Sequence, residues 1–385
     1  MKHLDSFYVD PHVRCAETLH PSMFTDPTWL ELEIERVFGR TWLFVPQRTA
    51  AESRDDPREL ADLVRLRGSQ APFHLIDRPL FLQRDWKDRL AAFPNVCTHA
   101  WFPLVDGPGR VKKIACRQHG RQFECDGRFY SQPGFGGDLE DFPRPCDDLV
   151  RLPVVEWSRF LFVALGKPKM SEDEALGEVR SSVFGLPLDR LRPAGHGAEV
   201  REVPGNWKQH AWNFMDRFHI GYIHRAPGGL ADAVRMESYR TELYPWSALQ
   251  WVHARDPAAG FDPALLPERF AHPEHRVFAL WWFVFPNLTL NFYPWGLSVN
   301  VYAPIPERPD RTLFHWYHYV LDEAKYARRE ELWLATQVDD EDVDAMAQVR
   351  RGIRSGYAVR GRFAAEEETG PHWFHRLVYE MVFEG

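Results

Sequence analysis

The sequence predicts an α+β protein with two domains, in which a small antiparallel β domain lies between an N-terminal helical segment and a larger domain of mixed helices and strands. The chain has 385 residues, which is more than a single hydrophobic core usually serves. Between residues 41 and 165, short apolar runs alternate with clusters of Pro, Gly and Asp, as in small β domains. From about residue 198 onward, helix and strand patterns are mixed.

The N-terminal segment contains one predicted helix. Residues 24–40 have the apolar spacing of an amphipathic helix, and Asp26 and Pro27 are placed as its cap and first residue. After the β domain, the polar stretch 166–178 (GKPKMSEDEALGE) predicts a linker or loop. We therefore expect a domain boundary near residue 165.

The larger domain combines buried strands with a long helix. Residues 278–304 predict a run of buried strands, and residues 328–354 predict one long helix. The resulting division assigns residues 1–42 to a helical segment that packs on the larger domain, residues 43–165 to the β domain and residues 166–385 to the larger domain.

The composition excludes several classes of partner. The chain has 47 Lys and Arg against 55 Asp and Glu, so its formal charge of −8 argues against nucleic acid. The most apolar run, residues 278–285, ends at Pro286 and is too short to span a membrane. The N-terminus has no apolar leader, and five cysteines are too few and odd in number for a disulfide framework. A reducing cytoplasm is therefore the expected location.

Two pairs of metal-binding residue types lie in the β domain. Cys97 and His99 form a Cys-x-His pair, and Cys116 and His119 form a Cys-x-x-His pair after a gap of sixteen residues. A structural zinc ion accepts two Cys and two His, but zinc fingers usually pair like with like along the chain. Unrelated core residues are a further alternative. A Rieske [2Fe–2S] cluster, in which two Cys hold one iron and two His hold the other, fits best and is favoured.

The motif around these residues resembles a known family. Residues 95–129 (NVCTHAWFPLVDGPGRVKKIACRQHGRQFECDGRF) are similar to the Rieske motif in the α subunits of Rieske non-haem iron oxygenases. This chain has Ala100-Trp101 where the family usually has Arg-Gly, and Gln118 where an aromatic residue is usual. All four ligand positions are kept, so we expect a bound cluster with an altered redox potential. We expect Trp101 to pack against its loop.

A second group of polar residues lies between positions 206 and 224 (NWKQHAWNFMDRFHIGYIH). On one helix, Asp216 and His219 would share a face, because they are three residues apart. His224 would lie about 140° away from His219 around the helix axis. The two histidines converge only if the helix breaks between them, which Gly221 permits. The spacing alone does not identify a metal site.

The same family carries Asn-Trp-Lys followed by a carboxylate-x-x-His-x-x-x-x-His, which matches residues 206–224. The resemblance implies that His219 and His224 bind iron, as two ligands of a 2-His-1-carboxylate site. It also implies that Asp216 is a bridging carboxylate, which joins His219 to the Rieske His119 of a neighbouring subunit.

The third iron ligand should be a carboxylate in the stretch of residues 337–356 (QVDDEDVDAMAQVRRGIRSG). Acidic residues at a helix start are common without any ligand role, because they suit the helix dipole. The resemblance selects Asp342, since the family's Glu-Asp pair, ten residues before a Gly, corresponds to Glu341-Asp342 and Gly352. Asp339 and Asp340 are near alternatives.

The resemblance implies a Rieske non-haem iron oxygenase, close to the choline, betaine and carnitine monooxygenase-like branch of the aromatic-ring-hydroxylating oxygenases. Its catalytic domain would be a helix-covered antiparallel sheet of the START-like helix-grip type. The implied cofactors are a [2Fe–2S] cluster and a mononuclear Fe(II), with O₂ as co-substrate. A ferredoxin or flavin reductase would supply electrons, and a homotrimer is implied because the two centres of one chain lie too far apart.

Such an enzyme would hydroxylate or N-dealkylate a small organic substrate. A quaternary amine would suit aromatic walls through cation–π contacts, and Trp281, Trp282, Tyr293 and Trp295 are candidates. Two alternatives stay open. One is a dioxygenase that hydroxylates the ring of an aromatic acid, and the other is an electron-transfer Rieske protein without oxygenase activity.

Overall fold

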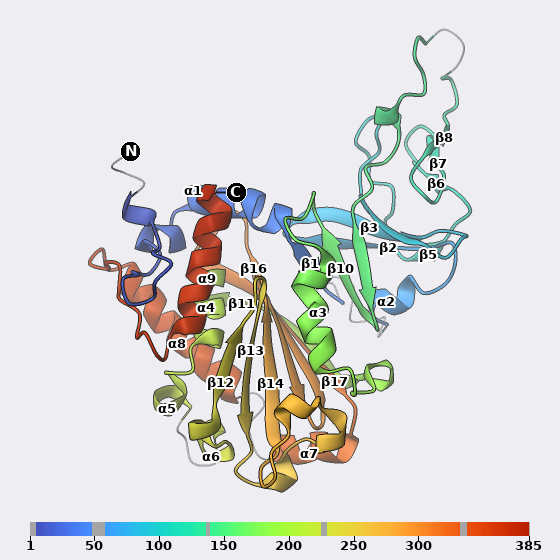
Figure 1. Ribbon diagram of the computed structural model, residues 1–385. Helices are drawn as coiled ribbons and strands as arrows, with labels where there is room; N and C mark the ends of the chain where they lie inside the picture. The colour runs from blue at the N-terminus through green and yellow to red at the C-terminus, as the bar shows by residue number, and fades with distance from the viewer. Residues whose placement is uncertain (1–4, 48–57, 136–138, 225–228, 332–336, 385) are drawn as a thin grey trace. The chain divides into compact units, whose positions relative to one another are not determined.

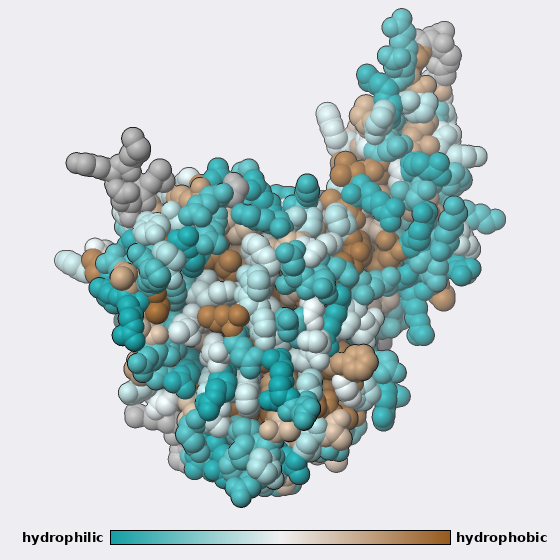
Figure 2. Space-filling model, in the orientation of Figure 1, coloured by the Kyte–Doolittle hydropathy of each residue, from teal (hydrophilic) through white to brown (hydrophobic). Residues whose placement is uncertain are grey.

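The computed structural model describes residues 5–47, 58–135, 139–224, 229–331 and 337–384 (Figure 1). The chain forms two compact units. One comprises Trp42–Pro168, and the other joins Met1–Thr41 to Lys169–Gly385. Within the described residues, no helix has the length and apolar content needed to cross a membrane. The face drawn in Figure 2 is mostly polar, with apolar side chains in scattered patches.

The smaller unit consists of three small antiparallel sheets. One sheet has the order β1-β10-β9, the second β4-β3-β2-β5 and the third β6-β7-β8. Their bounds are β1 Trp42–Phe44, β2 Ser69–Leu75, β3 Arg78–Arg84, β4 Leu90–Pro94, β5 Gly109–Arg110, β6 Ile114–Ala115, β7 Gln122–Phe123, β8 Phe129–Ser131, β9 Val154–Trp157 and β10 Phe160–Ala164. One short helix, α2 (Leu60–Leu63), precedes β2. The predicted small β domain is confirmed.

The larger unit is built on a seven-stranded antiparallel sheet of order β11-β17-β16-β15-β14-β13-β12. The strands are β11 Arg192–Pro204, β12 Arg240–Leu243, β13 Ser247–His253, β14 Val277–Val284, β15 Leu288–Tyr293, β16 Gly296–Pro304 and β17 Arg311–Val320. The helices are α1 Pro27–Arg36, α3 Glu172–Ser182, α4 Trp207–Met215, α5 Ile220–Ile223, α6 Leu230–Ala233, α7 Glu323–Glu331, α8 Gln337–Ile353 and α9 Thr369–Tyr379. The predicted α+β class is therefore confirmed.

Helices cover both faces of this sheet (Figure 1). Helix α3 packs on β13 and β14, whereas α4 packs on β16 and α8 packs on β11. Every residue of β14 is buried, as expected for a strand covered on both sides. The strands predicted over residues 278–304 are β14, β15 and β16. Side chains alternate between the two faces, so neighbours along β14 point to opposite sides.

Two of the predicted elements differ in the structure. The polar stretch 166–178 is not a linker throughout, because helix α3 begins within it. Ser171 caps this helix in a reciprocal capping box with Glu174 and starts an amphipathic helix. The long helix predicted over residues 328–354 is described as α7 and α8, and residues 332–336 lie outside the described residues.

Within the larger unit, a buried ion pair joins the N-terminal helix α1 to helix α4. Asp26 caps α1 as predicted, accepting a 2.9 Å hydrogen bond from the Thr28 N–H. On this helix, Glu33 lies 2.7 Å from the Nζ of Lys208 on α4, and both side chains are 0% exposed. The indole N–H of Trp207 donates to the same carboxylate at 2.8 Å. This contact orients the start of α4, the helix that leads into the histidine segment.

Candidate metal centres

Two loops of the smaller unit share one conformation and carry the Cys-His pairs. In each loop the cysteine N–H donates to the carbonyl five residues later, at 2.9 Å from Cys97 and 2.8 Å from Cys116. In each, the cysteine carbonyl accepts from the N–H four residues later, at 3.1 Å for Trp101 and 3.0 Å for Gly120. Both donors of this second bond have a positive φ. The chain therefore presents each Cys-His pair on an equivalent tight turn.

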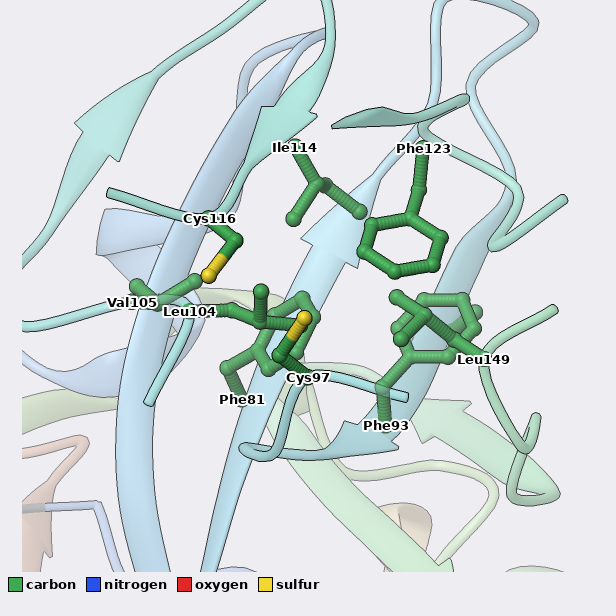
Figure 3. Close-up of a cluster of buried hydrophobic side chains, with 10 residues drawn as sticks. Phe81, Phe93, Cys97, Leu104, Val105, Ile114, Cys116, Phe123 and Leu149 are labelled. Atoms are coloured by element: carbon green, nitrogen blue, oxygen red, sulfur yellow. The ribbon is translucent and has the colours of Figure 1, made fainter. Parts of the chain in front are cut away.

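The four predicted cluster ligands come together. Cys97 is 1% and Cys116 3% exposed, and Figure 3 shows both side chains within the same cluster of buried apolar residues. His119 is exposed and His99 is half-buried, and their ring centroids lie 4.9 Å apart. The two cysteines are thus more shielded from solvent than the two histidines.

The donor set fits an iron–sulfur cluster. Burial raises the pKa of the Cys97 thiol, and the neighbouring Cys116 thiol raises this pKa further. Two thiolates this close therefore need a cationic partner, which iron ions supply. The backbone N–H groups of His99 and Ala100 hydrogen-bond the Cys97 sulfur and partly offset the shift.

Trp101 does not pack against its loop, so that expectation was wrong. Its side chain is 81% exposed, and its φ is +60°, in the left-handed region. Gln118 is also exposed. The side chains of Trp101 and Gln118 therefore lie on the surface of the loops, whereas the backbone N–H of Ala100 hydrogen-bonds the Cys97 sulfur.

The second predicted site is assembled by an interrupted helix. Helix α4 ends at Met215, and Asp216 is extended, with φ −88° and ψ 103°. His219 and His224 stand at the two ends of the one-turn helix α5. The break therefore falls on both sides of α5 and not at Gly221, which lies inside it. Asp216 and His219 do not share the face of one helix, contrary to the simple helical interpretation.

The donor atoms of the three predicted iron ligands lie close together. The Nε2 atoms of His219 and His224 are 3.1 Å apart. The Oδ1 of Asp342, on α8, lies 3.5 Å and 3.1 Å from them, respectively. Ligands at right angles on a metal with bonds of about 2.1 Å are about 3 Å apart, so the arrangement fits one ion. One ligand atom from each of these three residues lies within 4.8 Å of the other two.

The Asp342 carboxylate supports this assignment. Its Oδ1 is buried and has no hydrogen-bond partner among the described residues, although it faces two imidazoles. A buried carboxylate oxygen in this state needs a cation. Asp340, in contrast, is 61% exposed and pairs with Arg201 at 3.0 Å. Asp339 lines the neighbouring cavity but is not part of the three-residue group.

A second carboxylate lies near the Nδ1 atom of each histidine. The Nδ1 of His224 lies 2.8 Å from Glu341, and the Nδ1 of His219 lies 3.5 Å from Asp216. Such carboxylates orient metal-bound imidazoles. Burial alone would lower the pKa of His219, but Asp216 and Asp342 raise it to about 9. The site therefore attracts positive charge. Sequence reasoning did not single out Glu341 for this position, since any of several adjacent acids could have served.

A cavity of about 680 Å³ adjoins these ligands and is lined by the sheet. A row of paired residues crosses it from β13 to β17: Gln250, Trp281, Asn291, Ser298 and His318. The indole N–H of Trp281 donates to the Tyr293 hydroxyl at 2.9 Å, and Tyr293 stacks on Trp295 at 5.1 Å. Trp282 points to the other face, where it donates to Ser182. It is therefore not a wall of the cavity, contrary to expectation.

The fold and the two ligand sets define a redox metalloprotein, with a cluster-binding β unit and a second unit that places a metal site beside a substrate-sized cavity. Residues 58–143 match the family model of the Rieske [2Fe-2S] domain. Residues 188–384 match that of the ring hydroxylating alpha subunit (catalytic domain). The chain belongs to this family and is a Rieske non-haem iron oxygenase. Its cofactors are a [2Fe–2S] cluster and a mononuclear iron, with O₂ as co-substrate.

The relatives include enzymes that act on quaternary amines. The chloroplastic choline monooxygenase of Arabidopsis thaliana is 27% identical over 95% of this chain and 83% of its own. The carnitine monooxygenase oxygenase subunit of Acinetobacter baumannii is 25% identical over 97% and 95%. A crystal structure of the quaternary ammonium Rieske monooxygenase CntA has a TM-score of 0.74 at 22% identity, covering 97% of this chain and 99% of that one. An enzyme of this kind also needs an electron-transfer partner and a small substrate.

Proposed function

We propose that the enzyme oxidises a small quaternary amine, by hydroxylation or N-dealkylation. The observation that supports this most is the aromatic wall beside the iron ligands, in which Trp281, Tyr293 and Trp295 line one cavity with His219 and its neighbours. Aromatic faces attract an alkylammonium cation while leaving its methyl groups free to react. The choline and carnitine monooxygenases among the relatives support the same substrate class.

The roles of the individual residues follow from their chemistry. Cys97, His99, Cys116 and His119 would hold the cluster, and His219, His224 and Asp342 would hold the iron. When bound, the iron supplies the site at which dioxygen is reduced beside the substrate. The aromatic wall orients the amine and, with the surrounding apolar side chains, excludes water from it.

Asp216 has a positioning role in this proposal. Its carboxylate lies 3.5 Å from the Nδ1 of His219, on the side away from the metal-facing Nε2. It would link His219 to His119 of a neighbouring subunit within a homotrimer, with a ferredoxin or flavin reductase as electron donor. Inter-subunit electron transfer in a structurally related quaternary ammonium Rieske monooxygenase supports such an assembly. The cytoplasmic location stays a prediction.

Turnover with a substrate panel tests the proposal. The reduced holoenzyme would be mixed with O₂ and choline, carnitine, glycine betaine or an aromatic acid, and the organic product would be identified by mass spectrometry. We expect oxygenated or dealkylated amines and an unchanged aromatic acid. Asp342→Asn, which lacks an iron-binding charge, is the control for product formed outside the site. Hydroxylation of the aromatic acid, with no reaction of any of the amines, would contradict the proposal.

A further inference from the structure

The smaller unit contains an arginine whose charge is buried. The side chain of Arg121 is 2% exposed, and its Nε atom has no hydrogen-bond partner among the described residues. The backbone carbonyl of Arg121 accepts the N–H of Cys116 at 2.8 Å, so this residue closes the second ligand loop. A guanidinium in a protein does not lose its proton, and burying its charge is costly. Arg121 is therefore a fixed positive charge inside the unit that binds the cluster.

The guanidinium of Arg121 borders the core that contains the cluster cysteines. Its central carbon lies 5.9 Å from the ring centroid of Phe123, within the range of a cation–π contact. Phe123 belongs to the same cluster of buried side chains as Cys97 and Cys116 (Figure 3). The positive charge is thus next to the side chains that pack around the two sulfur ligands.

Aromatic rings also connect this charge to one of the histidine ligands. The central carbon of the Arg121 guanidinium lies 4.9 Å from the ring centroid of Phe129 and 6.0 Å from that of Phe142. The Phe142 ring lies 5.5 Å from that of Phe135, which lies 5.1 Å from the ring of His99. Rings have little polarity, so a charge in these surroundings acts over a longer distance than it would in water.

The charge partner of Arg121 is Asp147, which also contacts the first ligand loop. The Arg121 guanidinium donates to the Asp147 carboxylate, whose side chain is 15% exposed. The hydroxyl of Thr98, the middle residue of the Cys-x-His pair, donates to the backbone carbonyl of Asp147 at 2.8 Å. The Arg121–Asp147 pair therefore joins the two loops that carry the predicted cluster ligands.

Both members of this pair are charged. Burial alone would raise the pKa of Asp147, but hydrogen bonds from the Arg144 N–H, at 2.8 Å, and from the Arg121 guanidinium outweigh burial and lower this pKa. Arg117, in the same loop as Arg121, pairs with Asp106, but these side chains are 70% and 50% exposed. Water and salt screen the exposed pair much more than the buried one.

A buried charge beside a redox centre changes its potential, because one added electron adds one negative charge. The positive charge of Arg121 favours the reduced cluster, and the negative charge of Asp147 opposes it. We propose that Arg121 and Asp147 tune the reduction potential of the cluster in opposite directions, as a buried charge pair that bridges the two ligand loops.

Neither residue of the pair is one of the predicted ligands, so both act through the cluster and not on the substrate. The inference goes beyond the proposed amine oxidation and holds for any substrate. It does rest on the ligand roles proposed for the two Cys-His pairs, and the experiment below separates the two.

Potentiometric titration of the anaerobic holoprotein, followed by the Rieske-type EPR signal, tests the inference. Arg121→Met removes the positive charge and keeps an unbranched side chain against the aromatic rings. It should lower the equilibrium constant for one-electron reduction at least about threefold, which is about 30 mV at about 59 mV per tenfold change. Asp147→Asn removes the negative charge and keeps an acceptor for Arg121, so it should raise this constant by a similar factor.

The opposite signs distinguish charge from loop structure. Loosened loops would expose the cluster to water in either variant and would move both potentials in the same direction. Arg117→Gln is the matched control, because it removes an equal charge from the same loop at an exposed position. It should change the equilibrium constant less than about twofold. Arg121→Lys keeps the charge and should retain a potential close to that of the unmodified protein.

If Arg121→Met loses the cluster, Asp147→Asn and Arg121→Lys decide the question. A raised potential in the first and a nearly unchanged one in the second would support the inference. Shifts of the same sign in Arg121→Met and Asp147→Asn, or no rise in Asp147→Asn, would overturn it and leave the ligand assignment standing. Absence of a Rieske-type signal from the unmodified protein would overturn the ligand assignment, and the inference with it.

Discussion

Trp101 and Gly120 occupy the same position in two loops of equal conformation, with φ of +60° and +72°. Glycine adopts this backbone conformation without strain, whereas a residue with a Cβ does so at a cost of about 1–2 kcal/mol. A Cβ at Gly120 would also meet the ring of Pro133 at 3.2 Å. The indole of Trp101 is 81% exposed, so packing against the described residues offsets little of this backbone strain.

Trp101→Gly is therefore expected to stabilise the holoprotein by about 0.5–1 kcal/mol, since part of the relieved strain is offset by the greater freedom of glycine in the unfolded chain. Gly120→Ala should destabilise it by about 1 kcal/mol or more. Urea unfolding followed by the visible absorbance of the cluster measures both. A clear loss of stability in Trp101→Gly would mean that the indole has a packing partner after all.

The assignment of the iron carboxylate can be tested with two neighbouring acids. Asp342→Asn should lose the mononuclear iron while keeping the cluster, because a neutral amide replaces the buried charge facing His219 and His224. Asp340→Asn should keep both, since Asp340 is exposed and pairs with Arg201. Iron counting together with the visible spectrum distinguishes these results. Loss of the third iron in Asp340→Asn alone would reassign the ligand.

The buried pair between Glu33 and Lys208 should be sensitive to the loss of one partner. Lys208→Met leaves a buried, unpaired carboxylate on α1 and should lower the free energy of unfolding by about 3–5 kcal/mol. Replacing both residues, as Glu33→Leu with Lys208→Met, should recover most of this loss because no charge is left buried. Chemical denaturation of the two variants gives the comparison. A double variant as unstable as the single one would show that the pair itself is favourable.

Helix α8, which carries Asp342, is held near its C-terminal end by Asp310. Burial alone would raise the pKa of Asp310, but hydrogen bonds from Arg350 and Arg354, at 2.5 to 2.8 Å, outweigh it and keep this pKa below its ordinary value. A depressed carboxyl pKa stabilises the fold above the unfolded value of about 3.9, and this contribution is lost as pH falls through the folded pKa.

Asp310→Asn should accordingly cost about 1–2 kcal/mol at neutral pH, where the charged hydrogen bonds are intact in the unmodified chain. The difference in stability between the two proteins should shrink below about pH 4. Thermal unfolding across this pH range measures it. A difference that does not change with pH would show that the loss arises from packing instead of charge.

The sequence predicted the class of fold, and the grouping of the candidate ligands, better than the local backbone. The Cys-His spacing is specific because few other sites combine those residue types in two loops. The break around α5 could not be placed, because nothing local distinguishes a break at Gly221 from breaks at both ends of the helix. Helix α3 was predictable from Ser171 and Glu174, but the acidic composition of the stretch concealed the capping box.

The cavity walls show a different limit. Strand alternation predicts that Trp281 and Trp282 point to opposite faces, but the sequence does not say which face is hollow. Helix α3 covers one face of the sheet, and Tyr326 of α7 packs on Trp295 at the other face. Which face is hollow therefore depends on helices that are distant in sequence from these strands. Glu341 was equally undetermined, because the rotation of α8 decides which acid meets His224.

Iron and zinc counting combined with EPR of the dithionite-reduced, anaerobically purified protein tests the two-centre assignment most directly. We predict about three irons per chain, two in the cluster and one at the mononuclear site, together with a Rieske-type signal. His224→Ala should lower the count to about two and leave that signal in place, since His224 lies at the mononuclear site alone. Zinc in place of iron, with no EPR signal, would contradict the assignment of both centres.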